Sequence, residues 1–326
     1  MQASAKKVVV LGTGGTIAGV ARDRGDTLGY TAGVIPIRDL LANVAVSADL
    51  ELVAEQVMQL DSKDMNESAW CAILQRCRFW LAQDDVGALV ITHGTDTLEE
   101  TAFFLDAALP PDKPVVLTCA MRPASALVPD GPQNLADAIV LAKGLGEGGV
   151  YVVCAGLVHQ ACDVQKVHTD RLDAFDSGDP GPWGAIVAGQ IRKYGRGHGP
   201  KVTIDPDIVE RTAPQNWPRV EIVFNHAGAD GALIAAMLEP VADGRQVAGI
   251  VVAATGNGTV SDRLESALLA AQGRGVRVVR STRCARGSVT PVPAARVPDS
   301  RGLSPVKARI ALMLELLGGH WFTPQQ

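Results

Sequence analysis

Residues 8–19, VVVLGTGGTIAG, form the stretch that decides the fold. Four apolar residues end in a glycine-rich segment that carries Thr16, and residues 88–97, ALVITHGTDT, repeat this arrangement with Thr95. Each stretch reads as a buried parallel strand that stops at glycine and presents a threonine hydroxyl beyond its carboxyl end. Ligands bind at that edge of open α/β sheets. Two such threonines favour a hydrolase with a hydroxyl nucleophile over a cofactor-binding fold.

The glycine-rich segment matches neither of the common nucleotide-binding motifs. A dinucleotide fingerprint, G-x-G-x-x-G, accommodates Gly12 and Gly14 but meets Ile17 where its third glycine should be. A phosphate-binding P-loop needs Gly-Lys before Ser or Thr, whereas Gly19 is followed by Val20. The glycines are better explained by a close approach of the backbone to a small ligand.

Composition describes an ordinary globular protein. The chain has 326 residues, 47% hydrophobic and 20% charged, which is long enough for two domains. A net charge of −5 without a basic block argues against a nucleic-acid or membrane-surface partner, and no apolar run approaches the ~18 residues of a membrane helix. The six cysteines form no CxxC pair and the N-terminus lacks a signal-peptide core, so we expect a cytoplasmic protein with reduced thiols.

Short apolar runs alternate with helix-period segments, which predicts an α/β fold with a parallel sheet and crossover helices. In the first part, strands are predicted at 8–11, 50–57, 88–91, 115–118 and 150–154, and helices at 66–81, 98–108 and about 134–142. Glycine and proline then predict a linker at 196–217 between domains 1–195 and 218–326. In the last domain, strands are predicted at 220–224, 249–254 and 276–280, and helices at 232–238, 262–271 and 305–317.

Thr16 is the first candidate for chemistry. Its hydroxyl needs a base to take its proton and donors to stabilise developing charge, and backbone N–H groups near Gly14 and Gly15 are candidate donors. The alternative is that Thr16 caps the following segment. The polar, glycine-rich residues 19–33 are predicted to close over this site as a lid.

Thr95 and Asp96 form the second candidate group. A capping box, Thr97 with Glu100 or Asp96 with Glu99, explains part of this motif as the start of a helix. His93 alone reads as a structural histidine with its hydrogen bonds satisfied.

Lys166 is by sequence alone an ordinary solvated lysine. It becomes a base only where burial lowers its pKa from about 10.4. The neighbouring His159, Cys162, Asp163 and His168 match no tight zinc spacing, so we predict no metal site.

Three further polar residues have simple structural interpretations. Ser62 and Asp64 follow a predicted strand, so either can cap the next helix, and Ser62 can in addition donate to a substrate carboxylate. Asn257, between Gly256 and Gly258, reads first as a turn residue.

Together these motifs resemble the bacterial L-asparaginase family, which includes the asparaginase-glutaminases. The resemblance extends from Val8 to about Leu317, and seven motifs occur in the family's order. They are residues 13–19, Ser62–Met65, Thr92–Thr97, Ala120–Pro123, Asp130–Leu135, Asp163–Lys166 and Gly256–Gly258.

The resemblance implies a larger N-terminal and a smaller C-terminal α/β domain. It implies hydrolysis of L-asparagine to L-aspartate and ammonia, through an acyl-enzyme and without metal or organic cofactor. Thr16 matches the family's nucleophile and Tyr30 the tyrosine that activates it. Thr95, Asp96 and Lys166 match the group that handles proton transfer and water.

The resemblance also implies how substrate is bound. Ser62 and Asp96 match the residues that hold the α-carboxylate and the α-amino group, beside Gly15 and Thr95. Asn257 matches a residue that reaches the site of a neighbouring subunit, so the family implies a homotetramer built from dimers.

Two positions depart from the exported, high-affinity members of the family. Lys63 stands where those members have glutamine, and is expected either to strengthen carboxylate binding or to crowd the α-amino group. Residues 291–297 hold no counterpart of their partner-subunit glutamate. An asparaginase-glutaminase of broad specificity, an amidotransferase-type subunit acting with transfer RNA and a non-catalytic binding module remain as alternatives.

Overall fold

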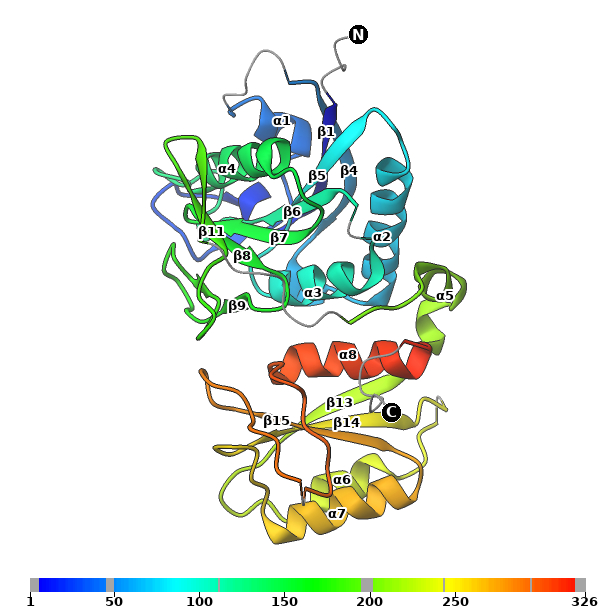
Figure 1. The fold of residues 1–326 in the computed structure, drawn as a ribbon. Helices are drawn as coiled ribbons and strands as arrows, with labels where there is room; N and C mark the ends of the chain where they lie inside the picture. The colour runs from blue at the N-terminus through cyan, green and yellow to red at the C-terminus, as the bar shows by residue number, and fades with distance from the viewer. Residues whose placement is uncertain are drawn as a thin grey trace. The chain divides into compact units, whose positions relative to one another are not determined.

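The computed structural model of the chain describes residues 6–44, 50–110, 112–194, 202–242, 244–293 and 295–319. The chain divides into two compact units, Met1–Pro200 and Lys201–Gln326, each with a sheet and flanking helices (Figure 1). The predicted two-domain α/β class is therefore confirmed.

The first unit is built on an eight-stranded sheet. Its parallel part has the order β4-β1-β5-β6-β7. These strands are Leu52–Leu60 (β4), Lys7–Gly14 (β1), Val86–Thr92 (β5), Pro114–Thr118 (β6) and Gly149–Cys154 (β7). Each predicted strand of this part thus exists. An antiparallel extension was not predicted, and it consists of Leu157–Gln160 (β8), Gly184–Val187 (β11) and Gln190–Lys193 (β12).

Helices cover both faces of this sheet (Figure 1). They are Ile37–Leu41 (α1), Glu67–Leu81 (α2), Leu98–Ala108 (α3) and Gly131–Gly144 (α4). Helices α1 and α4 share a core cluster with Val8, Val10 and Val90. Because side chains alternate along a strand, Val9 and Leu89 point to the opposite face, where α2 and α3 pack.

The strand order places a topological switch point between β1 and β5. From β1 the chain passes to β4 on one side, and the next strand, β5, lies on the other side of β1. Thr13 Oγ1 donates to Thr92 O at 2.7 Å and ties the carboxyl ends of these two strands together. Such a switch point is where α/β proteins bind their ligands, and Thr16 and Thr95 follow its two strands.

The second unit has a three-stranded parallel sheet in the order β13-β14-β15. The strands are Arg219–Phe224 (β13), Val247–Ala254 (β14) and Arg277–Thr282 (β15). Its helices are Pro206–Arg211 (α5), Ala232–Met237 (α6), Asp262–Gly273 (α7) and Pro305–Leu317 (α8). The predicted elements of this unit are all present.

The predicted linker at 196–217 is only partly irregular. Residues 195–201 lie outside the described residues. From residue 202 onward the chain forms α5 and a 3₁₀ turn at Pro214–Asn216 (η3), and Val209 and Trp217 are buried. Apolar side chains spaced among the prolines therefore build residues 202–217 into the second unit.

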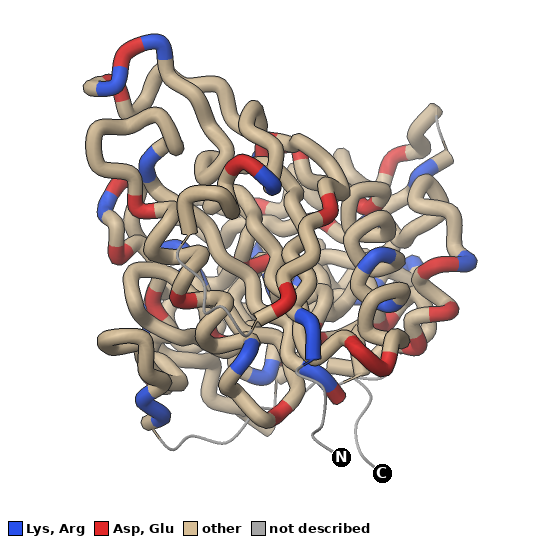
Figure 2. Tube along the Cα trace, turned by 90° about the horizontal axis from the view of Figure 1, so that it is seen from above, with Lys and Arg blue, Asp and Glu red and all other residues tan. Residues whose placement is uncertain are grey.

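Charged residues of both signs are interspersed along the chain rather than gathered by sign (Figure 2). Of the helices that the structure describes, none combines the length and apolar character that crossing a bilayer requires.

Candidate active site

Thr16 lies at the carboxyl end of β1, at the start of a 3₁₀ turn, Thr16–Ala18 (η1). The side chain does not cap this turn, so the structural interpretation of Thr16 is wrong. Its Oγ1 lies 2.7 Å from Tyr30 Oη, and the residue is only 6% exposed. A buried hydroxyl with a phenol as its neighbour has a group with which to exchange its proton.

Tyr30 is carried by the segment predicted as a lid. Residues Val20–Ala21 (β2) and Tyr30–Thr31 (β3) pair antiparallel as a hairpin, with Ala21 opposite Tyr30. The Tyr30 ring lies so close to Gly19 that a β-carbon there would come within 2.8 Å of Cδ2. The hairpin therefore packs the Tyr30 ring against the loop that carries Thr16.

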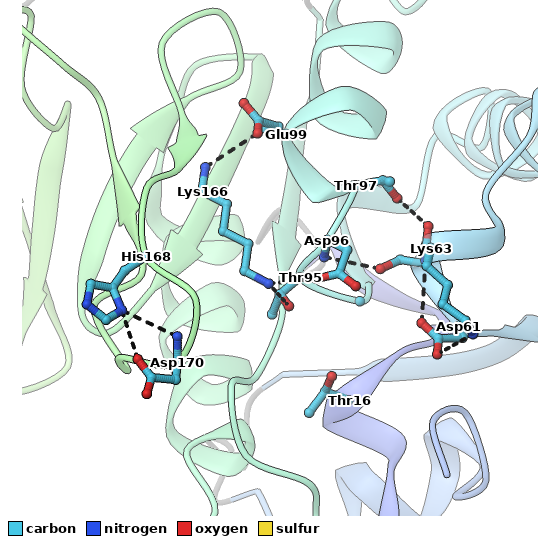
Figure 3. A network of polar contacts seen from close by, with 12 residues as sticks. Thr16, Asp61, Lys63, Thr95, Asp96, Thr97, Glu99, Lys166, His168 and Asp170 are labelled. Atoms are coloured by element: carbon cyan, nitrogen blue, oxygen red, sulfur yellow. Dashed lines mark hydrogen bonds and ion pairs between the residues drawn. The ribbon is translucent and has the colours of Figure 1, made fainter. Parts of the chain in front are cut away.

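Thr95, Asp96 and Lys166 form a second polar group (Figure 3). Lys166 Nζ donates to Thr95 Oγ1 at 2.8 Å and to Asp96 Oδ1 at 2.6 Å. Lys166 belongs to strand Gln165–Lys166 (β9), which pairs with Phe175–Asp176 (β10), and its side chain is 17% exposed. Lys166 is therefore not a solvated surface lysine.

Ser62 supports this group from behind. It lies in a 3₁₀ turn, Ser62–Asp64 (η2), and its Oγ accepts a hydrogen bond from the Asp96 N–H at 3.2 Å. Thr97 Oγ1 donates to Ser62 O at 2.8 Å. Ser62 thus fixes the backbone that presents Thr95 and Asp96.

The predicted helix caps at these positions are wrong. Thr97 is the N-cap residue of α3, but its side chain makes no cap bond, and its hydroxyl donates to Ser62 O instead. Helix α2 is capped by Asn66, whose side chain accepts from Ala69 N, and not by Ser62 or Asp64. Thr97 and Ser62 therefore bond to each other and to Asp96 within the site, and they do not cap the helices.

Gly15 contributes packing rather than a donor. Its N–H donates to Leu60 O at 2.9 Å, so the expected role of this N–H toward a ligand is not supported by the geometry. Gly15 has φ of 79°, in the left-handed region that glycine adopts readily.

Lys63 turns away from the group formed by Thr95, Asp96 and Lys166 (Figure 3). Its Nζ lies 2.8 Å from Asp61 Oδ2 and 3.1 Å from Asp64 Oδ2, and the side chain is 62% exposed. The hydrogen bond to Asp61 raises the pKa of Lys63 above its usual value. Local carboxylates hold this cation on the surface.

His93 has its predicted structural role. Nδ1 faces the carbonyl oxygen of Gly94 at 2.8 Å and therefore carries the proton, so Nε2 accepts from Thr101 Oγ1 at 2.9 Å. Thr101 in turn accepts from Trp70 Nε1 at 3.0 Å. Complete burial lowers the pKa of His93 to about 4 by desolvation, so the imidazole is neutral near pH 7.

The residues weighed as metal ligands do not converge. His159 Nδ1 contacts Ser177 Oγ at 2.8 Å, and His168 Nδ1 accepts from the backbone N–H of Asp170 and Arg171. Within the described ranges, no three His, Cys, Asp or Glu side chains gather as a metal site would require.

Asn257 belongs to the second unit, in the loop after β14. Gly256 and Gly258 flank it with φ of 47° and 80°, as its interpretation as a turn residue requires. Its Oδ1 accepts from Thr290 N at 2.7 Å, and its Nδ2 donates to Thr290 O at 3.4 Å.

One cavity of about 520 Å³ unites the two polar groups. It is lined by Thr16, Tyr30, Thr95, Asp96 and Lys166. Of the other described residues expected to bind substrate, Gly15 and Ser62 support this lining from behind, while Lys63 points elsewhere. The structure therefore brings together the residues that follow β1 and β5.

The cavity wall also includes residues that sequence reasoning did not single out, among them Arg24, Leu28, Leu127 and Asp170. They come from the hairpin and from two loops, where no periodicity marks a residue as facing a ligand. The motif at 120–123 was the available signal for this part of the wall, since Met121 and Arg122 line it.

Comparison with known proteins agrees with this geometry. Residues 7–197 match the family described as Asparaginase, N-terminal, and residues 219–321 match Glutaminase/Asparaginase C-terminal domain. L-asparaginase 2 of Bacillus subtilis (strain 168) is 37% identical over 94% of this chain and 81% of its own. Glutaminase-asparaginase of Pseudomonas fluorescens biotype A is 33% identical over 95% of this chain and 86% of its own.

Among solved structures, a probable cytoplasmic L-asparaginase from Campylobacter jejuni superposes with a TM-score of 0.87 at 33% identity, covering 96% of this chain and 95% of that one. Both family matches, and relatives similar along almost the whole sequence, lead to one conclusion: this chain belongs to the asparaginase family.

Proposed function

We propose that this protein is an L-asparaginase, which hydrolyses the side-chain amide of L-asparagine to L-aspartate and ammonia with Thr16 as nucleophile. This proposal rests on one observation: two threonine hydroxyls line one cavity, and each is hydrogen-bonded to a group that can exchange protons, Tyr30 or Lys166. The names of the relatives from Bacillus and Pseudomonas support the substrate.

In the first half of the reaction, Thr16 Oγ1 attacks the amide carbon and passes its proton toward Tyr30 Oη, 2.7 Å away. The C–N bond then breaks, and ammonia leaves with that proton, because an unprotonated amide nitrogen is a poor leaving group. The product of this half is an ester between Thr16 and the aspartyl group. These steps use side chains alone and need no cofactor.

In the second half, water attacks the ester and releases Thr16. Thr95 relays a proton from this water toward the amine of Lys166, 2.8 Å away. Thr16 Oγ1 takes up a proton through Tyr30 Oη as its bond to the acyl carbon breaks. The substrate's α-ammonium competes with Lys166 for the Asp96 carboxylate, which now bonds Nζ at 2.6 Å.

A zwitterionic amino acid needs an anion for its ammonium and donors for its carboxylate. Asp96 supplies the first. Ser62 Oγ accepts from Asp96 N, which leaves its own proton to be donated toward a carboxylate. In this proposal Asn257 of a neighbouring subunit completes the site within a homotetramer built from dimers, and the protein is cytoplasmic, as the name of the Campylobacter protein says of that relative.

L-glutamine is the second candidate substrate, because the Pseudomonas relative is named for both amides. The test is ammonia release from L-asparagine and L-glutamine by the native protein and by Thr16→Ala and Thr95→Ala. We expect each variant to stay folded and to lose at least about a hundredfold in turnover. Full activity in either variant contradicts the proposed roles, and similar turnover of both amides identifies a broad asparaginase-glutaminase.

A further inference from the structure

A serine outside the groups described above contacts the hairpin that carries Tyr30. Across β2 and β3, Ala21 pairs with Tyr30. The backbone N–H of Ala21 donates to Ser125 Oγ at 2.8 Å. Ser125 therefore binds the hairpin at the residue directly opposite the phenol that contacts Thr16.

Ser125 is held in a defined position by the loop to which it belongs, residues 121–130. The Asp130 carboxylate closes this loop by accepting hydrogen bonds from the N–H groups of Met121 and Arg122, each at 2.9 Å. Asp130 is also the N-cap residue of α4, so the loop is attached to a helix of the core. Ser125 thus presents its hydroxyl from a platform that does not belong to the hairpin.

The hairpin is short, so its closed position depends on contacts with the rest of the unit, among them the one between Tyr30 and Thr16. Its strands have two residues each, and a short hairpin alone is marginally stable in water. At its tip, Asp26 Oδ1 accepts from the N–H groups of Leu28 and Gly29, and Leu28 is 85% exposed. A second bond to the platform runs from Leu127 N to Arg24 O at 3.2 Å.

We propose that the Ser125 hydroxyl is a positioning group that keeps the hairpin closed and the Tyr30 phenol against Thr16. Its effect on turnover rests on the function proposed above, because it requires that Tyr30 assists Thr16. A hydrogen bond of ordinary net strength shifts the ratio of closed to open hairpin by roughly threefold to tenfold. Ser125→Ala removes this bond and leaves the groups that touch substrate in place.

Closure is measured directly by trypsin, because Arg22 and Arg24 lie within the hairpin. Cleavage at these residues follows the open population when opening is fast. We expect Ser125→Ala to be cut there roughly three to ten times faster than the native protein, and Ser125→Thr at the native rate. Ser68→Ala, an exposed serine on α2, is the matched control and should not change the rate.

Should Ser125→Ala be unstable, Ser125→Thr and Ser125→Val form a second pair with the same shape, of which only the first has a hydroxyl. Faster cleavage in Ser125→Val alone supports the proposal. Equal cleavage of Ser125→Ala and Ser125→Thr, or of Ser125→Val and Ser125→Thr, overturns the positioning role of Ser125, whatever the enzyme's activity. Such a result does not affect the proposed function.

Activity separates positioning from a general structural effect. Ser125→Ala should lower kcat/KM by up to roughly tenfold in the native background and cause no further loss in Tyr30→Phe, since both changes act through one phenol. The same loss in both backgrounds contradicts positioning through Tyr30. Full activity of Tyr30→Phe itself removes Tyr30 from the proposed mechanism, whereas the trypsin result for hairpin closure stands by itself.

Discussion

Gly15 and Gly94 meet backbone to backbone, so that a β-carbon on Gly15 would overlap the Cα and N atoms of Gly94. Gly15 follows β1 and Gly94 follows β5, so this contact joins the loop of Thr16 to the loop of Thr95. A β-carbon on Gly94 would in turn overlap Ser62 Oγ. Because Gly15 and Gly94 have no side chains, the loops that carry Thr16, Thr95 and Ser62 pack closely against one another.

Gly15→Ala should therefore damage both stability and activity. We expect a loss of about 2–4 kcal/mol in the free energy of unfolding, from overpacking and a left-handed backbone, and at least about a hundredfold loss in turnover. Gly189→Ala is the control, because Gly189 also has positive φ, 73°, but open space around its β-carbon position. Urea denaturation and ammonia release check both variants, and equal effects would show that backbone strain, not the contact with Gly94, dominates.

The two lysines near Thr16 and Thr95 should respond differently to removal of their charge. Lys166→Met deprives Thr95 of its proton-exchanging partner, so we expect at least about a hundredfold loss in kcat. Lys63→Met removes a cation held by Asp61 and Asp64, and KM for L-asparagine should stay within about twofold. Steady-state kinetics with both amides measure this contrast. A large change in KM for Lys63→Met would place that side chain on the substrate.

The buried His93 should make stability depend on pH. Its pKa is about 4 in the folded protein, against 6.5 without burial, so the unfolded chain binds more protons between these values. The stability from neutral His93 is complete above the unfolded pKa and is lost as pH falls through the folded pKa. We expect roughly 3 kcal/mol of pH-dependent stability that His93→Gln lacks. Unfolding in urea at about pH 7 and about pH 4.5 tests this, and an equal difference between the two proteins at both pH values contradicts it.

The shared site proposed through Asn257 predicts complementation between two weak variants. Thr16→Ala and Asn257→Ala should each have low activity alone. In a mixed dimer, one of the two sites keeps both native residues, so co-expression should restore about a quarter of native activity. Light scattering should report a mass four times the 34.1 kDa chain. A monomer, or no gain on mixing, rules out a site shared between subunits.

The parallel core could be predicted from sequence because its residues obey simple patterns. Val8, Val9 and Val10 are all buried, as a strand covered on both faces requires. Helix α2 was marked by its apolar period, and α8 by Pro305 at its start and Gly318 after its end.

The antiparallel extension could not be predicted, because its turns lack the usual signals. Strands β7 and β8 are joined by Ala155-Gly156, and β11 and β12 by Ala188-Gly189. Ala155 and Ala188 have φ of 49° and 52°, in the left-handed region where asparagine or glycine is expected. The sheet, not the local sequence, imposes these conformations.

The candidate site also has features that could be predicted from sequence and features that could not. The positions of Thr16 and Thr95 follow from strand ends, which local sequence marks well. The contact of Thr97 with Ser62 O could not be read from sequence, because a capping box competes for the same residue and only the tertiary fold decides between them.

The pairing of β1 with β5 also determines the order in which parts of the protein fold. Thr13 and Thr92, which close the strand ends, are separated by 79 positions along the chain. Helices form from neighbouring residues, whereas this pairing must wait until a long loop has closed. When the denatured protein is diluted into buffer, far-UV ellipticity should therefore recover before ammonia release does. A nascent chain whose β5 is still inside the ribosome cannot yet form the site.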